Sequence, residues 1–278
     1  MKKIFMRYPN GRPKALTLSY DDGVEQDIEL VARMKKYGVL GTFNLNSGLF
    51  APEGTIYKDG QIHRRMTEKM AYNLFTDSGM EVAVHSLTHP QLEKFPPNCV
   101  LWEVISDRSK LEKLFGTPIH GMAYPFGTYN DMVVEQLKNA GIWYSRTTVS
   151  TGAFRQPTDW LRLPATCHHK NPSLMELNKQ FLSEIPKSEP ALFYLWGHSY
   201  EFEADNNWQI IEDFLSTVSG HVDIWYATNT EIYTYTKAYE DLDFNIDCDI
   251  VTNPSALSVW ISYDGEAIEI KSGQTIRL

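Results

Sequence analysis

Hydrophobic and polar residues follow one recurring order along this chain: a segment with helical periodicity ends at a glycine, and a short apolar run follows at once. The glycines concerned are Gly38, Gly79, Gly116, Gly141 and Gly220. Glycine just past a helix is the usual left-handed cap, and the apolar runs have strand length and strand composition. Together with the runs at 15–20 and 191–199, this pattern predicts about seven strands that alternate with helices.

Three amphipathic segments between these runs predict helices, at 26–38, 100–116 and 132–141. A βα repeat of this kind either closes into a barrel or forms an open parallel sheet. Helices cover the strands on both faces in such folds, which explains why the runs are apolar throughout. We therefore expect a fold of the α/β class.

The chain changes character at about residue 240, where helical periodicity gives way to short alternating strands. The segment 262–270 predicts a hairpin around Asp264 and Gly265, and the segment 271–278 predicts another turn and strand. We expect a larger unit over residues 1–239 and a small C-terminal β extension over residues 240–278. The extension is too short to be an independent domain.

The composition is typical of a soluble globular protein. Of 278 residues, 42% are hydrophobic, and the formal net charge of −9 argues against a nucleic-acid partner, which usually needs a basic patch. The aromatic share of 13% suits a sugar-binding cleft as well as core packing. No run of about 18 apolar residues is present that could span a membrane.

The cysteines and the N-terminal segment point to a reducing compartment. Cys99, Cys167 and Cys248 are scattered and odd in number, so no disulfide framework is implied. The first residues are basic but lack the apolar stretch of a secretory signal. We expect a cytoplasmic protein, with export open if a leader has been trimmed.

Reactive side chains gather where the predicted strands end. They are Asp21, Asp22, Asn46, His85, the segment 124–127, Arg146 and His198. Parallel α/β folds collect their chemistry at the C-terminal ends of the strands. We therefore expect these side chains to share one cleft.

Two of these motifs favour a catalytic metal with a separate proton acceptor. His85 and His89 are four residues apart, which places two imidazoles on one face of a helical turn. Asp21 and Asp22 directly follow an apolar run, so one carboxylate can bind the ion and the other can take a proton from water. A plain turn or a solvated surface is the alternative for both pairs. His198 is a candidate acid, because imidazole titrates in the right range.

Four motifs follow one another at the ends of successive predicted strands, and they read SYDDG, HSLTH, YPFG and LWGH. Together they resemble the motif series of the polysaccharide deacetylase family, the NodB-homology group of carbohydrate esterase family 4. The resemblance covers residues 14–235 and leaves the C-terminal extension out. It implies a distorted (β/α)7 barrel.

The resemblance also implies a role for each matching residue. Asp21 would be the general base. The metal ligands would be Asp22, His85 and His89, around a divalent ion that is usually zinc and sometimes cobalt or nickel.

Two further roles and a set of substrate contacts follow from the same resemblance. The backbone N–H of Phe126 would face the oxyanion of the tetrahedral intermediate. His198 would protonate the departing amine. Substrate contacts are expected from Tyr124, Pro125, Trp160 and Trp196.

The chain departs from the family pattern in two places. Ala123 stands near the position where the third motif usually carries an arginine that orients the catalytic aspartate. Arg146, at the end of the next strand, could supply the guanidinium; otherwise it is a surface arginine. The Asp-Trp pair of the fourth motif is found only at Asp159 and Trp160, farther along the chain than usual.

The segment CHHK at 167–170 resembles a second metal cluster. Adjacent side chains on an extended segment point in opposite directions, so both histidines can hardly bind one ion. We expect a loop that lines the cleft.

These features predict a metal-dependent hydrolase that cleaves a non-peptide C–N bond. The expected reaction is N-deacetylation of an N-acetylated amino sugar or oligosaccharide, with no nucleic-acid or membrane partner. One alternative is a ring-opening amidohydrolase that acts on a small cyclic amide or ureide. Another is a non-catalytic carbohydrate-binding protein, which would have no need of two carboxylates, two ligand histidines and an acid.

Overall fold

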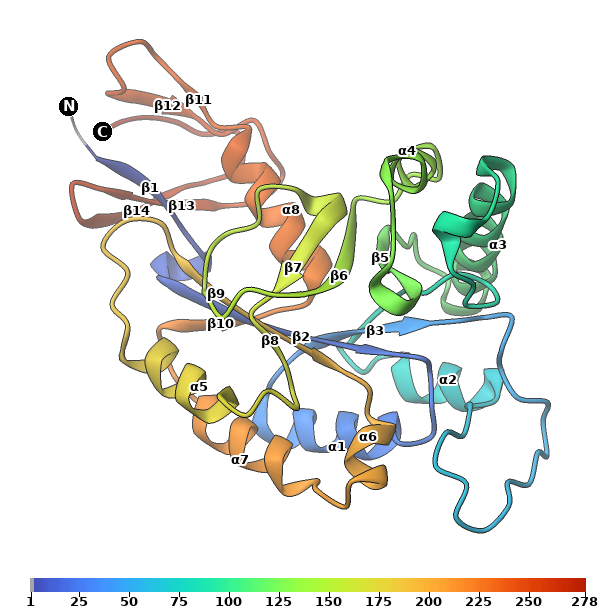
Figure 1. The fold of residues 1–278 in the computed structure, drawn as a ribbon. Helices are drawn as coiled ribbons and strands as arrows, with labels where there is room; N and C mark the ends of the chain where they lie inside the picture. The colour runs from blue at the N-terminus through green and yellow to red at the C-terminus, as the bar shows by residue number, and fades with distance from the viewer. Residues whose placement is uncertain (1–2) are drawn as a thin grey trace.

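The computed structural model describes residues 3–278, and a nine-stranded, parallel sheet forms its centre (Figure 1). The strands of this sheet are β2 (Lys14–Asp21), β3 (Gly41–Leu45), β4 (Glu81–Val84), β5 (Gly121–Ala123), β6 (Tyr144–Ser150), β7 (Leu163–Ala165), β8 (Cys167–His168), β9 (Ala191–Gly197) and β10 (Ile224–Tyr226). The helices are α1 (Asp27–Tyr37), α2 (Glu68–Phe75), α3 (Pro97–Phe115), α4 (Asp131–Asn139), α5 (Leu174–Ser183), α6 (Tyr200–Ala204), α7 (Gln209–Val218) and α8 (Asn229–Glu240). Single 3-10 turns are η1 (Pro9–Gly11), η2 (Leu92–Lys94), η3 (Pro125–Gly127) and η4 (Trp160–Arg162).

The two terminal strands of the sheet, β7 and β8, are almost adjacent in the sequence. The strands pair in the order β7-β6-β5-β4-β3-β2-β9-β8, and β7 and β8 are separated only by Thr166. Thr166 donates its backbone N–H to the carbonyl of Tyr194 on β9, at 2.8 Å. The sheet therefore curls into the expected distorted barrel, although β7 and β8 do not pair with each other and the ladder is not closed.

All seven apolar runs form strands. β10 pairs only with Lys14–Leu16 at the start of β2. The segment 163–168 supplies two short strands, β7 and β8, at the two sheet ends, whereas the expected loop at 167–170 begins with β8. The segment 163–168 is short and contains Pro164, so it shows no periodicity that could have identified it.

The helix ends follow from local sequence. α1 and α3 end at Gly38 and Gly116, which have φ values of 65° and 67°, so both adopt the left-handed conformation that glycine favours. α8 begins with a capping box, in which Thr228 and Glu231 satisfy each other's backbone N–H groups. No helix within residues 3–278 combines the length and the apolar character needed to cross a bilayer.

The two faces of the central strands have different surroundings. Helices α1, α5 and α7 lie on one side of the sheet, and α3, α4 and α8 lie on the other (Figure 1). On β2, Leu16 and Leu18 belong to the main apolar core, whereas the alternate residue Thr17 points the other way and donates to Asn229 at 2.8 Å. The inner face of β2 therefore carries buried polar residues, Thr17, Ser19 and Asp21, that lead to the strand end.

Two small antiparallel sheets form the C-terminal segment. One contains β1 (Ile4–Arg7), β13 (Val259–Tyr263) and β14 (Glu266–Ile270), and the other contains β11 (Asp243–Phe244), β12 (Ile250–Thr252) and β15 (Thr275–Arg277). The expected hairpin is present, with Asp264 and Gly265 at positive φ between β13 and β14. The N-terminal strand β1 pairs with β13, which the sequence pattern did not indicate. The division at residue 239 stays a prediction.

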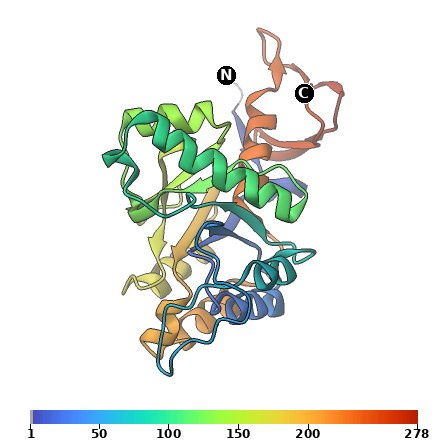
Figure 2. The ribbon, with the colours of Figure 1, turned by 90° about the vertical axis from the view of Figure 1, so that its right-hand side faces the viewer.

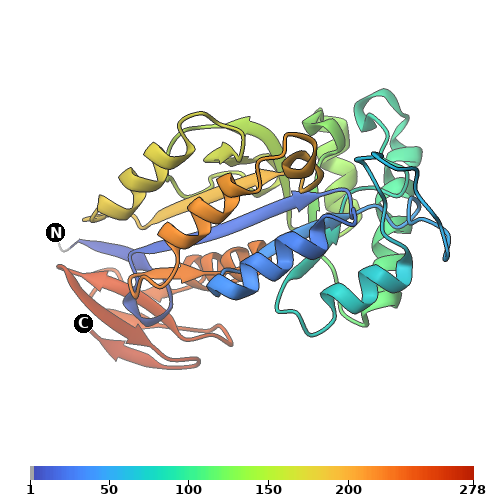
Figure 3. The ribbon, with the colours of Figure 1, turned by 90° about the horizontal axis from the view of Figure 1, so that it is seen from below.

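The C-terminal strands lie at the end of the barrel from which β2 starts, and they project beyond the body of the molecule (Figures 2 and 3). The side chain of Ala267 on β14 packs against Gly11, just before β2 begins. The extension and the C-terminal strand ends are therefore at opposite ends of the molecule.

Candidate active site

Three side chains from two strand ends could share one ion. The ligand atoms of Asp22, His85 and His89 all lie within 4.8 Å of one another. Asp22 follows the last residue of β2 with φ 85°, and His89 lies in the loop after β4 with φ 57°. These left-handed backbone positions are costly for residues other than glycine, and such strain is concentrated at functional sites.

His85 has the free nitrogen that a metal ligand needs. Its Nδ1 lies 2.8 Å from the carbonyl of Ala123, which can only accept a hydrogen bond, so the ring proton is on Nδ1. Nε2 then carries the free lone pair, and this atom is buried without a hydrogen-bond partner among residues 3–278. Burial lowers the pKa of His85, which keeps the imidazole neutral. A carbonyl that fixes the tautomer of a ligand histidine is common in metal sites, so the residues fit a metal.

Two side chains from the long β3–α2 segment, Arg65 and His63, lie beside Asp22. Nη2 of Arg65 lies 3.1 Å from Oδ1, and Nη1 of Arg65 also donates to the backbone carbonyl of Asp22. Nε2 of His63 lies 3.4 Å from Oδ2. Burial favours the neutral acid, but His63, His85 and these neighbours together hold the pKa of Asp22 far below its ordinary value. The sequence carried no signal for Arg65 or His63, because only the folded loop brings them to the site.

Asp21 is held by two other side chains. Its Oδ1 accepts a hydrogen bond from Asn44 at 2.9 Å, and its Oδ2 pairs with the guanidinium of Arg146. Oδ2 also lies 3.9 Å from Nε2 of His85 and 3.9 Å from Nε2 of His198. Burial opposes ionisation, but Arg146 and the two histidines hold the pKa of Asp21 below its ordinary value. The carboxylate is therefore ionised and lies between a ligand histidine and the candidate acid.

Arg146 lies beside Ala123, the position near which the family usually has an arginine. The two residues are register partners on the neighbouring strands β5 and β6. The side chain of Arg146 is fully buried, and its guanidinium lies 4.4 Å from the ring centre of Trp196. A buried cation needs a partner, and Asp21 is that partner.

His198 follows β9 and faces two carboxylates. Its Nδ1 lies 3.4 Å from Oε2 of Glu201, and its Nε2 faces Asp21. Burial alone would lower the pKa of His198, but Glu201 and Asp21 raise it above the ordinary value. The spacing of Glu201, three residues after His198 at the start of a helix, is a signal that sequence reasoning missed.

The predicted substrate contacts are only partly brought to this place. The ring of Phe126 is 57% exposed and lies 4.5 Å from the ring of His89, centre to centre. Tyr124 and Pro125 are buried, and the Tyr124 hydroxyl donates to Leu161 at 2.7 Å. Trp160 packs edge-on against Tyr233 of α8, at 5.0 Å between ring centres.

Two buried aspartates hold the loops that carry the site, and sequence reasoning missed both. Asp107 on α3 accepts hydrogen bonds from the backbone N–H of His85 at 3.1 Å and of Ser47 at 2.7 Å. Asp27 on α1 accepts one from the hydroxyl of Ser199 at 2.6 Å. Burial raises the pKa of Asp107 to about 7 and that of Asp27 to about 8. Both sit in amphipathic helices, where a polar residue is ordinary and gives no signal.

The expectation that His168 and His169 point in opposite directions is wrong. The Nε2 atoms of both lie 3.2 Å from Oε2 of Glu201. β8 ends at His168, and the chain turns there, as the hydrogen bond from Asn171 N–H to the His168 carbonyl shows. The alternation of an extended strand therefore no longer applies.

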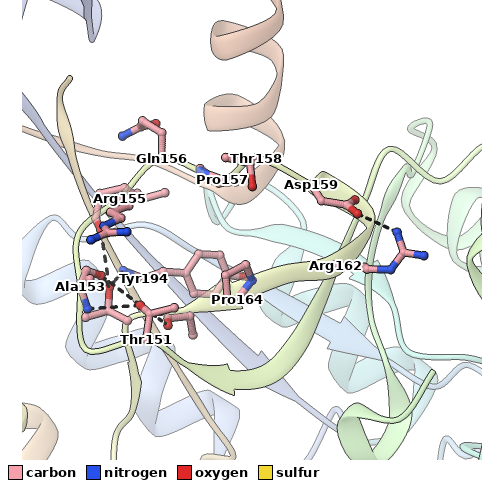
Figure 4. A pocket seen from close by; sticks show the side chains of 13 residues that line it. Thr151, Ala153, Arg155, Gln156, Pro157, Thr158, Asp159, Arg162, Pro164 and Tyr194 are labelled. Atoms are coloured by element: carbon pink, nitrogen blue, oxygen red, sulfur yellow. Dashed lines mark hydrogen bonds and ion pairs between the residues drawn. The ribbon is translucent and has the colours of Figure 1, made fainter. Parts of the chain in front are cut away.

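A separate pocket of about 480 Å³ lies beside the segment 151–166 (Figure 4). Its lining includes the ion pair of Asp159 with Arg162, at 2.7 Å, and reaches Tyr194 on β9. It shares no lining residue with the cluster around Asp22. The pocket is therefore distinct from the candidate active site.

Known proteins share this fold. The family model described as "Polysaccharide deacetylase" matches residues 8–145. A "putative polysaccharide deacetylase" from Mycobacterium smegmatis is similar with a TM-score of 0.56 and 13% identity, over 84% of this chain and 93% of that one. At this identity the likeness shows the fold alone.

Two other structures resemble the chain less well. The Streptococcus pyogenes deacetylase PplD, in complex with acetate, has a TM-score of 0.45 and 23% identity; the match covers 52% of this chain and 62% of that one, which is less than two thirds of its length. A CE4 family pseudoenzyme from Bacillus anthracis has a TM-score of 0.49 and 16% identity, over 82% and 68% of the two chains. No curated protein matches the sequence. Residues 8–145 therefore match the polysaccharide deacetylase family, and the rest of the chain completes a fold that known members of this family share.

Proposed function

We propose that this chain is a metal-dependent N-deacetylase that acts on an N-acetylated amino sugar in a saccharide. The observation that carries the proposal is the place of Asp21. Its Oδ2 lies 3.9 Å from a nitrogen of His85 on one side and 3.9 Å from a nitrogen of His198 on the other. An ionised carboxylate between a ligand histidine and a protonatable imidazole is the arrangement that hydrolysis with separate base and acid needs.

Asp22, His85 and His89 would hold the metal. Their donor set of one carboxylate oxygen and two imidazole nitrogens suits zinc, and cobalt or nickel also accept such ligands. Three protein ligands leave positions open for water and substrate. When bound, the metal polarises the acyl carbonyl and lowers the pKa of water.

The other side chains divide the proton transfers. Asp21 takes a proton from the attacking water at Oδ2, and Arg146 and Asn44 keep this carboxylate ionised and oriented. His198 gives a proton from Nε2 to the departing amine. The backbone N–H of Phe126, beside His89, would stabilise the oxyanion.

The test is acetate release from N-acetylglucosamine oligomers by zinc-loaded protein. We expect turnover by the wild type and a loss of about 100-fold or more in kcat for Asp21→Asn, since a general base contributes 10²- to 10⁴-fold. The exposed Asp59→Asn variant, which makes the same chemical change, serves as control. An Asp21→Asn enzyme as fast as the wild type would remove Asp21 from the role of base, and ring opening of a cyclic ureide without acetate release would replace the substrate class.

A further inference from the structure

Glu201 on α6 collects more side chains than any role in the proposed reaction explains. Its Oε2 lies 3.2 Å from Nε2 of His168 and 3.4 Å from Nδ1 of His198. Its Oε1 lies 3.2 Å from Nζ of Lys170, which also pairs with Asp205 at 2.7 Å. Only 17% of the Glu201 side chain is exposed. A carboxylate held from both oxygens in this way has little freedom to move.

The ligand atoms of His168, His198 and Glu201 lie close enough to hold a second metal ion. The tautomer of His168 argues against that use. Lys170 donates its backbone N–H to Nδ1 of His168 at 3.1 Å, so Nδ1 carries the lone pair and Nε2 carries the proton. Nε2 therefore donates to Glu201 and has no lone pair for a metal. The cluster is a hydrogen-bonded one, with Glu201 as its common acceptor.

The same cluster determines how His198 is oriented. With Nδ1–H donating to Glu201, the other ring nitrogen of His198 faces Asp21. We propose that Glu201 is the positioning residue of His198: it holds Nδ1–H, directs Nε2 into the reaction site, and is itself fixed by His168 and Lys170. This inference rests on the proposed function, in which His198 is the acid.

The charges around His198 support this role. The groups that face it are Asp21 and Asp22 from the β2 end, Glu201 and Tyr200 from α6, and His168 and His169 from the turn after β8. Asp21 faces Nε2 of His198, and Glu201 is the carboxylate beside the other ring nitrogen, Nδ1. Its removal leaves only the carboxylates at the β2 end, Asp21 and Asp22, to stabilise the imidazolium.

The experiment compares Glu201→Gln with Glu203→Gln. Glu203 is on the same helix two residues later, but its carboxylate pairs with Arg64, at 2.8 Å, and not with His198. Glu201→Gln should lower kcat about 10- to 100-fold with little change in KM, because orientation of the acid matters most in the transition state. The basic limb of the kcat profile should move to lower pH. Glu203→Gln should behave like the wild type, and Glu201→Asp should recover part of the loss.

A second measurement does not depend on activity. NMR titration of the histidine side chains, with His198 assigned through His198→Gln, should show a lower pKa for His198 in Glu201→Gln and an unchanged one in Glu203→Gln. An unaltered pKa together with a wild-type kcat in folded Glu201→Gln would overturn the proposal. A wild type that titrates as expected but releases no acetate would instead count against the proposed reaction.

Discussion

At the scale of single residues, adjacent aspartates have separate partners. Asp22 faces the two ligand histidines and Arg65, whereas Asp21 is held by Arg146 and Asn44. Neighbouring side chains in a strand point to opposite faces. Because β2 ends at Asp21 and the backbone reaches φ 85° at Asp22, the two carboxylates need not do so. We therefore expect their substitution to have different effects on metal binding.

Asp22→Ala should lose both bound zinc and activity, and Asp21→Asn should keep its zinc while losing activity. The reason is that Asp22 belongs to the ligand group and Asp21 does not. Metal content after dialysis, measured by mass spectrometry, checks the prediction. Equal zinc content in the two variants would contradict this division.

Arg146→Gln should shift the acidic limb of kcat/KM to higher pH, because Arg146 is the main group that lowers the pKa of Asp21 against the effect of burial. Stability should fall as well, by about 3–5 kcal/mol, since the substitution leaves a buried carboxylate without its charged partner. Arg162→Gln is the matched control, because Arg162 pairs with exposed carboxylates. A pH profile identical to that of the wild type would contradict the role of Arg146.

At the scale of elements, buried carboxylates tie the helices to the loops of the site. Asp27 joins the start of α1 to Ser199 at the start of α6 through one hydrogen bond, between residues 172 positions apart in the sequence. Asp107 joins α3 to the loops after β3 and β4 in the same way. These contacts make the arrangement of the loops depend on groups that titrate.

Asp27 should make the protein less stable as the pH rises from about 4 to about 8. Burial raises its folded-state pKa to about 8 from an ordinary value of 3.8, so the folded state keeps a proton that the unfolded chain has released. The contribution to the slope is at most about 1.4 kcal/mol per pH unit. The difference in unfolding free energy between wild type and Asp27→Asn, measured by urea denaturation, should therefore fall across this range. The exposed Asp59→Asn variant should show a constant difference.

At the scale of the whole molecule, strand β1 from the start of the chain pairs with β13 from the C-terminal extension, at the end of the barrel away from the site (Figure 3). An apolar cluster that includes Val251, Val259 and Ile261 packs against Ala238 at the end of α8. The hydroxyl of Tyr235 also accepts a hydrogen bond from the backbone of Trp260 at 2.8 Å. These contacts attach the extension to α8, away from the candidate active site.

Removal of residues 241–278 should lower Tm by about 5 °C or more, because it exposes this cluster and leaves β1 without its partner. Zinc content and the specific activity of the folded fraction should be retained at low temperature. Calorimetry and acetate release check the two parts. A truncated protein with unchanged Tm would show that the extension is not part of the stable unit.

The sequence by itself determined the βα order, the helix ends at Gly38 and Gly116, and the residues at the strand ends, because these depend on local periodicity and on neighbours in the chain. Only the tertiary structure decided that the segment 163–168 joins the two ends of the sheet and that β1 pairs with β13. It also decided that Arg65, Asp107 and Glu201 surround the site. Each of those contacts joins segments that are far apart in the sequence, and no local pattern indicates which distant segment a residue will meet.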